Sequence, residues 1–347
     1  MAAIHVMSIR EPKLPSLYIL LATFNGAKYL PQLLDSLREQ QICDWRLLVR
    51  DDGSSDETVQ IIRSAMDGDT RIELLEGTPG RMGVTKSFEI LMTEALHREA
   101  EFFVLCDQDD VWLSDKLSTL SAALLRECAI GKPALAFSDL TVVDAQLNVM
   151  DRSFFSRSHA GEAWHTPGKW LLLHNLVPGC AMMGNRELLR RCLPMPSGTV
   201  IHDWWVLLCA ASMGQVVAVS EPLILYRQHG GNTIGAEIYL KRILRFLRDW
   251  RVTCREKQQI FLGSIAQDLA LEQRLNLDDP KESAWRSEIG RMFTGLFSPS
   301  RWRRLNALLF GNVRRVGWAR NLLLLCVLLT VSARQITGVT TTRRRVD

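Results

Sequence analysis

The first hundred residues alternate between short apolar runs and segments whose apolar residues recur at helical spacing. The runs predict strands buried on both faces, because half-exposed strands alternate apolar with polar residues. Strands separated by helices form parallel sheets covered on both faces by helices. We therefore predict an α/β fold with strands at 17–23, 46–49, 71–75 and 102–106, helices at 29–40, 57–66 and 87–96, and a later strand at 134–143 that Asp139 breaks.

Three of these strands end in polar or acidic loops, at 23–25, 51–52 and 107–110. The carboxyl ends of parallel strands line up, so these loops should converge on one crevice. The three carboxylates within 107–110 would repel one another, and a hard divalent cation such as Mg²⁺ or Mn²⁺ would relieve that repulsion. An exposed acidic turn that caps the helix starting near Ser114 has the same pattern, so the loop alone leaves both interpretations open.

The glycine motifs of two common nucleotide-binding folds are missing from the sequence. No GxGxxG follows the first strand, and no GxxxxGK[ST] occurs anywhere. A dinucleotide-dependent oxidoreductase and a P-loop phosphotransferase are therefore disfavoured. We expect the crevice to hold phosphates through carboxylates and a metal ion.

The composition is that of a globular protein, with 47% hydrophobic and 23% charged residues in a chain of 347. The eight cysteines are scattered without a CxxC pair, which predicts reduced, buried thiols in a cytosolic protein. The first sixteen residues lack the apolar core of a signal peptide, so we expect a cytoplasmic protein.

Three segments, in order along the chain, resemble the signatures of family 2 glycosyltransferases of the GT-A fold. They read LYILLATFNGAKYLPQLLDSL from Leu17, RLLVRDDGSSDETVQII from Arg46 and VLCDQDDVWLSDKL from Val104. Within the family, the bacterial rhamnosyltransferase-like members are the most similar. The resemblance implies a GT-A catalytic domain over 15–235, with a mostly parallel nucleotide-binding sheet flanked by helices, and a helical C-terminal region over 236–347.

The resemblance also implies a binding site for a nucleotide sugar. Thr23 and Asn25 would lie against the base and ribose, and Asp52 would accept a hydrogen bond from the imide N–H of uracil or thymine. Lys86 would reach the diphosphate, although a solvated lysine at a helix start is an equally good interpretation. The complete set implied for the donor is Thr23, Asn25, Asp52, Lys86, Asp107, Asp109 and Arg227.

The acidic loop corresponds to the DxD region of the family, where carboxylates hold Mn²⁺ or Mg²⁺ against the diphosphate. By this resemblance one or two of Asp107, Asp109 and Asp110 ligate the metal, and another binds ribose or sugar hydroxyls. Asp109 and Asp110 are the strongest candidates for the metal. Arg227 and His229, in the segment LILYRQHGGNTIG, would contact the diphosphate or metal from the other side. The cation would neutralise charge on the departing nucleoside diphosphate.

The segment IHDWW, from Ile201, resembles the place where the family has its catalytic base. Asp203 fits this role, because the start of a helix favours an ionised carboxylate; a plain helix cap is the alternative. Trp204 and Trp205 would be either core aromatics or a wall for a sugar. Gly179, in a segment resembling the one beneath the acceptor, would allow close backbone approach.

These roles together imply an inverting, metal-dependent transferase. A hydroxyl of a saccharide or lipid-linked acceptor, deprotonated by Asp203, would attack the anomeric carbon of a dTDP- or UDP-sugar in one displacement. The subgroup resemblance implies dTDP-rhamnose as donor and a role in cell-surface polysaccharide biosynthesis. A two-metal nucleotidyltransferase would also need clustered aspartates, but the Asp52 and Asp203 motifs disfavour it.

The C-terminal third is strongly basic, with ten arginines and one acid from Arg301 to the end. Such a tail suits an anionic membrane surface, so a non-enzymatic, basic membrane-binding protein is a further alternative; we expect no nucleic acid partner. The apolar stretch 321–333 would reach about 20 Å as a helix, short of the ~30 Å hydrocarbon core. It predicts an interfacial helix at the inner face of the cell membrane, or else a helix packed on the protein.

Overall fold

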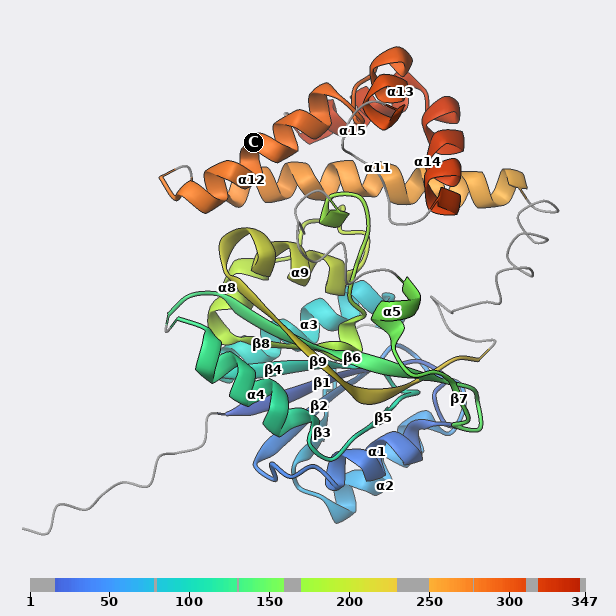
Figure 1. Cartoon of the computed structure of the whole chain (residues 1–347). Helices are drawn as coiled ribbons and strands as arrows, with labels where there is room; N and C mark the ends of the chain where they lie inside the picture. Colours follow the sequence, from blue (N-terminus) through green and yellow to red (C-terminus); the bar gives the residue numbers. More distant parts are fainter. Residues whose placement is uncertain are drawn as a thin grey trace, which may run out of the picture.

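A single mixed sheet organises the chain in the computed structural model, which describes residues 16–77, 80–129, 131–158, 170–229, 250–276, 278–309 and 318–343. Its strand order is β3-β2-β1-β4-β8-β6-β9-β5, and β7 pairs with β6 outside this path. The sheet curls between helical layers, and a further layer of helices lies beyond α9 (Figure 1). The strands are β1 Leu17–Thr23, β2 Trp45–Asp51, β3 Ile72–Leu74, β4 Phe102–Cys106, β5 Val111–Trp112, β6 Ala134–Val143, β7 Val149–Asp151, β8 Met182–Asn185 and β9 Gln215–Arg227.

The helices follow the predicted alternation in the first half of the chain, with small differences at their ends. α1, α2 and α3 each connect one parallel strand to the next, as expected of crossover helices. The helices are α1 Leu30–Arg38, α2 Thr58–Gly68, α3 Val84–His97, α4 Lys116–Glu127, α5 Phe154–Ser158, the 3-10 turn η1 Gly179–Ala181, α8 Arg186–Cys192, α9 His202–Met213, α11 Trp250–Arg274, α12 Pro280–Thr294, α13 Arg301–Leu309, α14 Trp318–Thr330 and α15 Ala333–Arg343.

The parallel half of the sheet is β3-β2-β1-β4, as the apolar runs predict. β1 pairs in parallel with β2 and β4, and β2 pairs in parallel with β3. Ile19, Leu20 and Leu21 in β1 are fully buried, because both faces of this central strand are covered. This half of the α/β prediction is confirmed.

The other half of the sheet mixes strand directions. β8 is antiparallel to both β4 and β6, whereas β6 and β9 run parallel over most of their length. The prediction that Asp139 breaks the strand at 134–143 is wrong, because β6 continues through it with a register shift. Its buried carboxylate is satisfied within the fold, where Oδ1 accepts the N–H of Leu140 (2.8 Å) and of Phe155 (3.2 Å).

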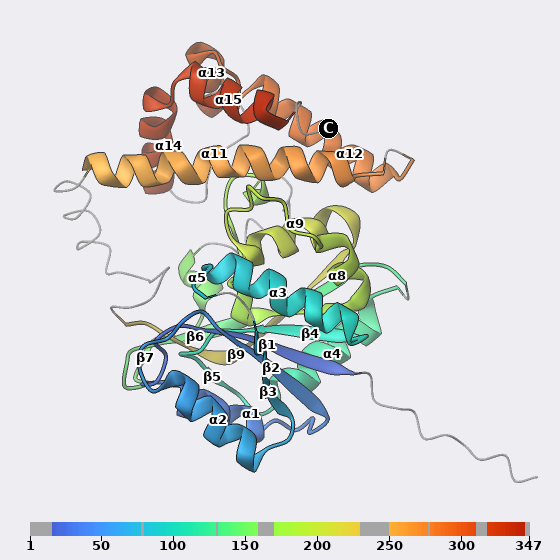
Figure 2. The ribbon, with the colours of Figure 1, turned by 180° about the vertical axis from the view of Figure 1, so that it is seen from behind.

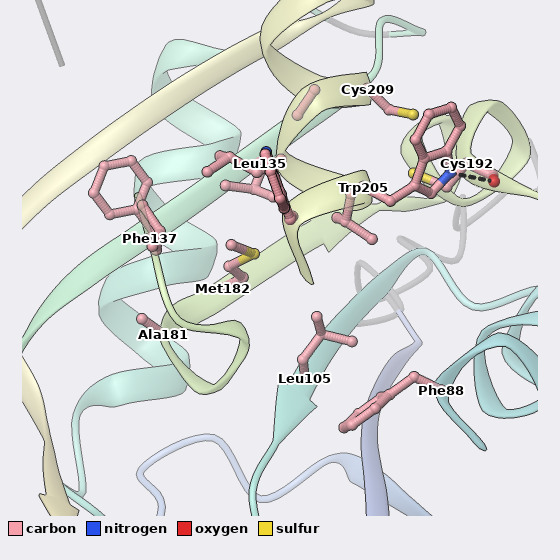
Figure 3. Close-up of a cluster of buried hydrophobic side chains, with 14 of the residues drawn as sticks. Phe88, Leu105, Leu135, Phe137, Ala181, Met182, Cys192, Trp205 and Cys209 are labelled. Carbon is pink, nitrogen blue, oxygen red and sulfur yellow. Dashed lines mark hydrogen bonds between the residues drawn. The ribbon is translucent and has the colours of Figure 1, made fainter. Parts of the chain in front are cut away.

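The main core lies between the sheet and helices α3, α8 and α9. Figure 3 shows Phe88 of α3 and Trp205 of α9 on the side of the sheet that carries Leu105 and Leu135. Trp205 is fully buried, and its indole N–H donates to the carbonyl of Cys192 at 2.8 Å. Trp204 is also buried, and its indole N–H donates to a backbone carbonyl. Both tryptophans are therefore core aromatics.

The C-terminal helices form a layer around α11, which lies against α9 (Figures 1 and 2). α14 and α15 pack on α11. Within the stretch 321–333, four apolar side chains are buried in the protein, namely Leu324, Val327, Leu328 and Val331. The interpretation of this stretch as a helix packed on the protein therefore holds for these side chains. The predicted catalytic-domain end at 235 lies outside the described residues.

Among the described residues, no single helix combines the length and apolar character needed to cross a bilayer. The segments Leu323–Thr330 and Ala333–Thr340 satisfy those criteria only when taken together, and they meet at an angle of 86°. All eight cysteines are free thiols, and five of them are buried, as predicted. Cys43 is exposed, and Cys128 and Cys326 are partly exposed.

Candidate active site

The loops after β1 and β2 are joined by side-chain hydrogen bonds. The Thr23 hydroxyl donates to Asp51 Oδ1 at 2.9 Å, and Asp51 Oδ2 accepts the N–H of Ser54 at 2.8 Å. Asn25 has a positive φ of 49°, and its Oδ1 accepts the N–H of Ser55 at 2.8 Å. The first two polar strand ends therefore converge as predicted. Thr23 is buried within this junction, and Asn25 is exposed on it.

Gln108 connects the acidic loop after β4 to the same junction. The Gln108 Oε1 accepts the N–H of Phe24 at 2.9 Å, and the Gln108 amide nitrogen donates to the Phe24 carbonyl at 3.0 Å. A Cβ at Gly26 would lie 2.3 Å from Gln108 Oε1, so any other residue here would have to displace this amide. The Arg81 guanidinium stacks over the Phe24 ring at 4.3 Å. All three strand ends thus meet at one edge of the sheet.

Asp52 anchors the loop that precedes α3. Its Oδ1 accepts from Arg50 Nη1 (2.8 Å) and from the N–H of Met82 (2.7 Å), and its Oδ2 accepts the N–H of Gly83 (2.8 Å). Burial alone would raise the pKa of Asp52, but the hydrogen bonds from Met82, Arg50 and Gly83 together hold that pKa below its usual value. The carboxylate is therefore ionised at neutral pH. Recognition of a base by Asp52 stays a prediction.

Asp107 and Asp110 form a close group with Cys180, and the ligand atoms of all three lie within 4.8 Å of one another. Asp110 is fully buried and accepts the N–H of Arg227 on Oδ1 at 3.0 Å. Within the described residues, Asp110 Oδ2 has no nitrogen or oxygen hydrogen-bond partner and lies near the Cys180 thiol. A buried carboxylate oxygen without such a partner suits a cation, so this group fits a metal ion.

The raised pKa values of Asp107 and Asp110 also fit a bound cation. Burial, followed by the charges of Asp109 and Asp203, raises the pKa of Asp107 to about 7. Burial and the charges of Asp109 and Asp107 also raise the pKa of Asp110 well above its usual value. A cation bound here would favour the ionised carboxylates and lower both pKa values.

Asp109, the middle acid of the loop, points to a different partner. Its Oδ2 lies 2.8 Å from His229 Nε2, and the His229 ring lies 4.8 Å from the Tyr29 ring. The structure thus pairs Asp109 with His229, while Asp110 groups with Asp107 and Cys180. Sequence reasoning did not single out Cys180 as a member of the acidic group.

Arg227 is buried and ties β9 to the acidic loop. Its Nε donates to the Asp109 carbonyl at 2.7 Å, Nη1 to the Ala145 carbonyl at 2.7 Å, and Nη2 to Gln32 Oε1 at 2.6 Å. These bonds hold the loop that carries Asp109 and Asp110. Lys86, in contrast, is half exposed on α3 and pairs with Glu89 at 2.7 Å.

A buried lysine, Lys116, lies near Asp107, Asp110 and Cys180. Its burial there was not predicted from the sequence. Its ammonium donates to the Cys180 carbonyl at 2.8 Å and lies 3.1 Å from the centre of the Trp112 ring. Burial lowers the pKa of Lys116 to about 7, against the opposing influence of the nearby thiols and of Asp110 and Asp107. Nothing in the local sequence distinguishes this lysine from a solvated one.

Asp203 occupies the first turn of α9, as predicted. Its Oδ2 accepts the N–H of Gly179 at 3.0 Å, and its Oδ1 accepts the N–H of Trp204 at 2.7 Å. Burial raises the pKa of Asp203 to about 6. A Cβ at Gly179 would lie 3.1 Å from the Asp203 Cβ, so glycine permits the close backbone approach expected of it. The carboxylate is thus oriented by the backbone and more basic than an ordinary aspartate.

Residues 18–191 match the family described as glycosyl transferase family 2. The dTDP-rhamnosyl transferase RfbG of Shigella flexneri is 24% identical over 233 residues, which cover 64% of this chain and 75% of that relative. The GalNAc(5)-diNAcBac-PP-undecaprenol beta-1,3-glucosyltransferase of Campylobacter jejuni is 30% identical over 107 residues, which cover 31% of this chain and 34% of that one.

Two solved structures share the fold at low sequence identity. S. aureus TarS 1-349 in complex with UDP-GlcNAc has a TM-score of 0.55 and 15% identity, covering 96% of this chain and 92% of its own. The mannosyltransferase PcManGT from Pyrobaculum calidifontis, in complex with GDP-Man and Mn²⁺, has a TM-score of 0.51 and 17% identity, covering 95% and 87%. The mixed α/β architecture is therefore that of GT-A glycosyltransferases.

Proposed function

The chain belongs to glycosyl transferase family 2 and is a glycosyltransferase, and we propose that it is a metal-dependent, inverting enzyme of cell-surface polysaccharide biosynthesis. It would move a sugar from a dTDP- or UDP-sugar to a hydroxyl of a saccharide or lipid-linked acceptor. The observation that carries this proposal is that Asp203 lies close to the acidic loop: it accepts the N–H of Gly179, and the next residue, Cys180, groups with Asp107 and Asp110. Asp107, Asp109 and Asp110 lie on the acidic loop, and the charge of Asp203 reaches Asp107 from α9.

The donor is proposed to be dTDP-rhamnose. Support comes from the printed name of the Shigella flexneri relative, a dTDP-rhamnosyl transferase. A thymine base offers an imide N–H, and the ionised Asp52 is a suitable acceptor for it. A carboxylate oxygen can accept two hydrogen bonds, and Asp52 Oδ2 accepts one, from Gly83, among the described contacts. Thr23 and Asn25 would border the base and ribose, and Lys86 would face the diphosphate. Arg227, which was expected to contact the diphosphate, is buried and bonded within the protein, so we propose that it positions the acidic loop instead.

The metal is proposed to be Mn²⁺ or Mg²⁺, held by Asp109, Asp110 and His229. Hard cations prefer carboxylate oxygens, and the Cys180 thiol, whose pKa burial raises well above its usual value, stays protonated. Asp107 would bind hydroxyls of the donor. When bound, the cation would neutralise charge on the departing nucleoside diphosphate.

Asp203 is proposed as the catalytic base. Its backbone hydrogen bonds from Gly179 and Trp204 hold the carboxylate in one orientation, and its pKa of about 6 leaves it ionised at neutral pH yet able to take a proton. The acceptor hydroxyl would lose its proton to Asp203 as its oxygen attacks the anomeric carbon from the face opposite the diphosphate. One displacement inverts that carbon and forms no sugar–enzyme bond.

The cellular setting belongs to the same proposal. We place the protein in the cytoplasm, peripheral at the inner face of the cell membrane, with a catalytic domain over 15–235 and a helical region over 236–347. The Campylobacter jejuni relative is named for an undecaprenol-linked acceptor, which supports a lipid-linked acceptor for this chain.

The test is a donor panel with purified protein, in which UDP-, dTDP- and GDP-sugars are titrated with Mn²⁺ and again after chelation with EDTA. We expect metal-dependent binding that is tightest for a dTDP-sugar, and release of a nucleoside diphosphate on transfer. Release of pyrophosphate would contradict glycosyl transfer, and equal binding after chelation would contradict the metal.

A further inference from the structure

Helix α13, in the C-terminal layer, exposes apolar and cationic side chains together. Trp302 is 83% exposed, the largest exposed fraction of any large apolar side chain in the described part of the chain, and Leu309 is 54% exposed. These two residues are seven positions apart, so they lie on one side of the helix. Arg301 and Arg303 flank Trp302 and are also exposed. We call these four residues the α13 surface.

The opposite side of α13 is fixed to the protein by a buried arginine. Arg304 is fully buried, and its Nη2 donates to the carbonyls of Leu328 (3.1 Å) and Val331 (2.9 Å) at the end of α14. Leu308, one turn later, is also buried. Arg304 and Leu308 therefore fix which side of α13 faces the protein, and the α13 surface faces away from it.

The stretch of sequence that contains this helix carries charges of one sign only. From residue 289 to residue 346 the sequence contains eleven arginines and no acidic residue. An exposed tryptophan and leucine on one helix side, flanked by arginines, match the side chains that lie at the headgroup level of an anionic bilayer. Nucleic acid would pair with the arginines but would leave Leu309 without a role.

We propose that the α13 surface docks the protein on an anionic lipid surface, with Trp302 and Leu309 at the interface and Arg301 and Arg303 on the lipid phosphates. This contact differs from the stretch 321–333, whose side chains at 324, 327, 328 and 331 are buried in the protein. α13 lies on the side of α11 away from the sheet in both views, so docking through it would not cover the strand ends that carry the acidic loop (Figures 1 and 2).

Co-sedimentation of the full chain with vesicles tests the proposal without requiring turnover. Vesicles made of equal parts phosphatidylcholine and phosphatidylglycerol should bind the protein, and vesicles of phosphatidylcholine alone should bind it much less. Trp302→Ser should weaken binding about tenfold, and Arg301→Gln with Arg303→Gln should weaken it by a similar factor that salt reduces. Circular dichroism melting would establish that the variants are folded.

Matched variants elsewhere separate this surface from general charge or hydrophobicity. Leu125→Ser removes a side chain that is 67% exposed on α4, and Arg63→Gln with Arg190→Gln removes two exposed arginines of other helices. These controls should bind vesicles as the unaltered protein does.

Unchanged binding of folded Trp302→Ser would overturn the proposal. If a short DNA duplex displaces the protein from the vesicles, and if the α13 variants no longer bind that duplex, the surface would be assigned to nucleic acid instead. Loss of vesicle binding with transfer to a soluble acceptor retained would leave the proposed function standing.

Discussion

Asp107 and Asp203 come from elements almost a hundred residues apart, yet they belong to one electrostatic site. After burial and the charge of Asp109, the charge of Asp203 is the next cause that raises the pKa of Asp107 to about 7. Gly179, whose N–H donates to Asp203, is followed directly by Cys180, which groups with Asp107 and Asp110. The proposed metal-binding loop and the proposed base therefore lie close together.

Asp203→Asn should abolish transfer while leaving donor binding nearly intact. The amide keeps the size of the side chain but cannot take a proton, and loss of a general base typically costs about a hundredfold to ten-thousandfold in rate. Turnover and donor affinity would be measured on the same preparation. Asp35→Asn, at an exposed position, is the matched control and should have full activity. Transfer by Asp203→Asn within about threefold of the control, a difference of about 0.65 kcal/mol in activation free energy, would remove Asp203 as the base.

Activity should fall as the pH falls through about 6, the pKa of Asp203. The base acts only when ionised, so the rate is full above this pKa and is lost as the carboxyl becomes protonated below it. The profile would be recorded at saturating Mn²⁺, which keeps Asp107 ionised and removes its contribution near pH 7. A profile flat from pH 5 to 8, a range of about one unit or more on each side of this pKa, would contradict the assignment.

Much of the parallel half of the fold could be predicted from the sequence, because its strands are buried on both faces and read as unbroken apolar runs. β1 at 17–23 and β4 at 102–106 have the predicted bounds. The convergence of three polar strand ends followed from topology alone. Asp203 was also predicted at the start of a helix, where α9 has it.

The other half depended on contacts that local sequence does not record. β8 is only four residues long, and its place between β4 and β6 is set by packing. The hydrogen bond from Lys116 to the Cys180 carbonyl, and the approach of Cys180 to Asp110, both join segments more than sixty residues apart. Asp139 was predicted to break its strand, because burying an aspartate without hydrogen-bond partners costs free energy. In the structure a partner comes from a later segment, since the N–H of Phe155 donates to its carboxylate.

Two candidate ligand sets for the metal can be separated by single substitutions. Asp109→Asn and Asp110→Asn should each weaken Mn²⁺ binding in the presence of dTDP about tenfold or more, because each removes a charged oxygen ligand. Cys180→Ser should leave Mn²⁺ affinity almost unchanged, because the thiol is protonated and a hydroxyl can still donate to the carboxylates. Calorimetric titration with Mn²⁺ would measure all three. Large losses in Cys180→Ser and Asp110→Asn, with the affinity of Asp109→Asn unchanged, would instead identify a metal held by Asp107, Asp110 and Cys180.

Gly26→Ala should lower the free energy of unfolding of the protein through a single contact with Gln108. The added Cβ would lie 2.3 Å from Gln108 Oε1, so the amide that bonds the Phe24 backbone must move, and such overpacking typically costs about 1–3 kcal/mol. Gln108→Ala removes the clashing group, so the double variant should be more stable than the sum of the two single losses predicts. Urea unfolding of the four proteins gives the coupling energy, and Gly68→Ala, where a Cβ meets nothing within 4 Å, is the matched control. Additive losses within about 0.5 kcal/mol would show that Gly26 and Gln108 do not interact.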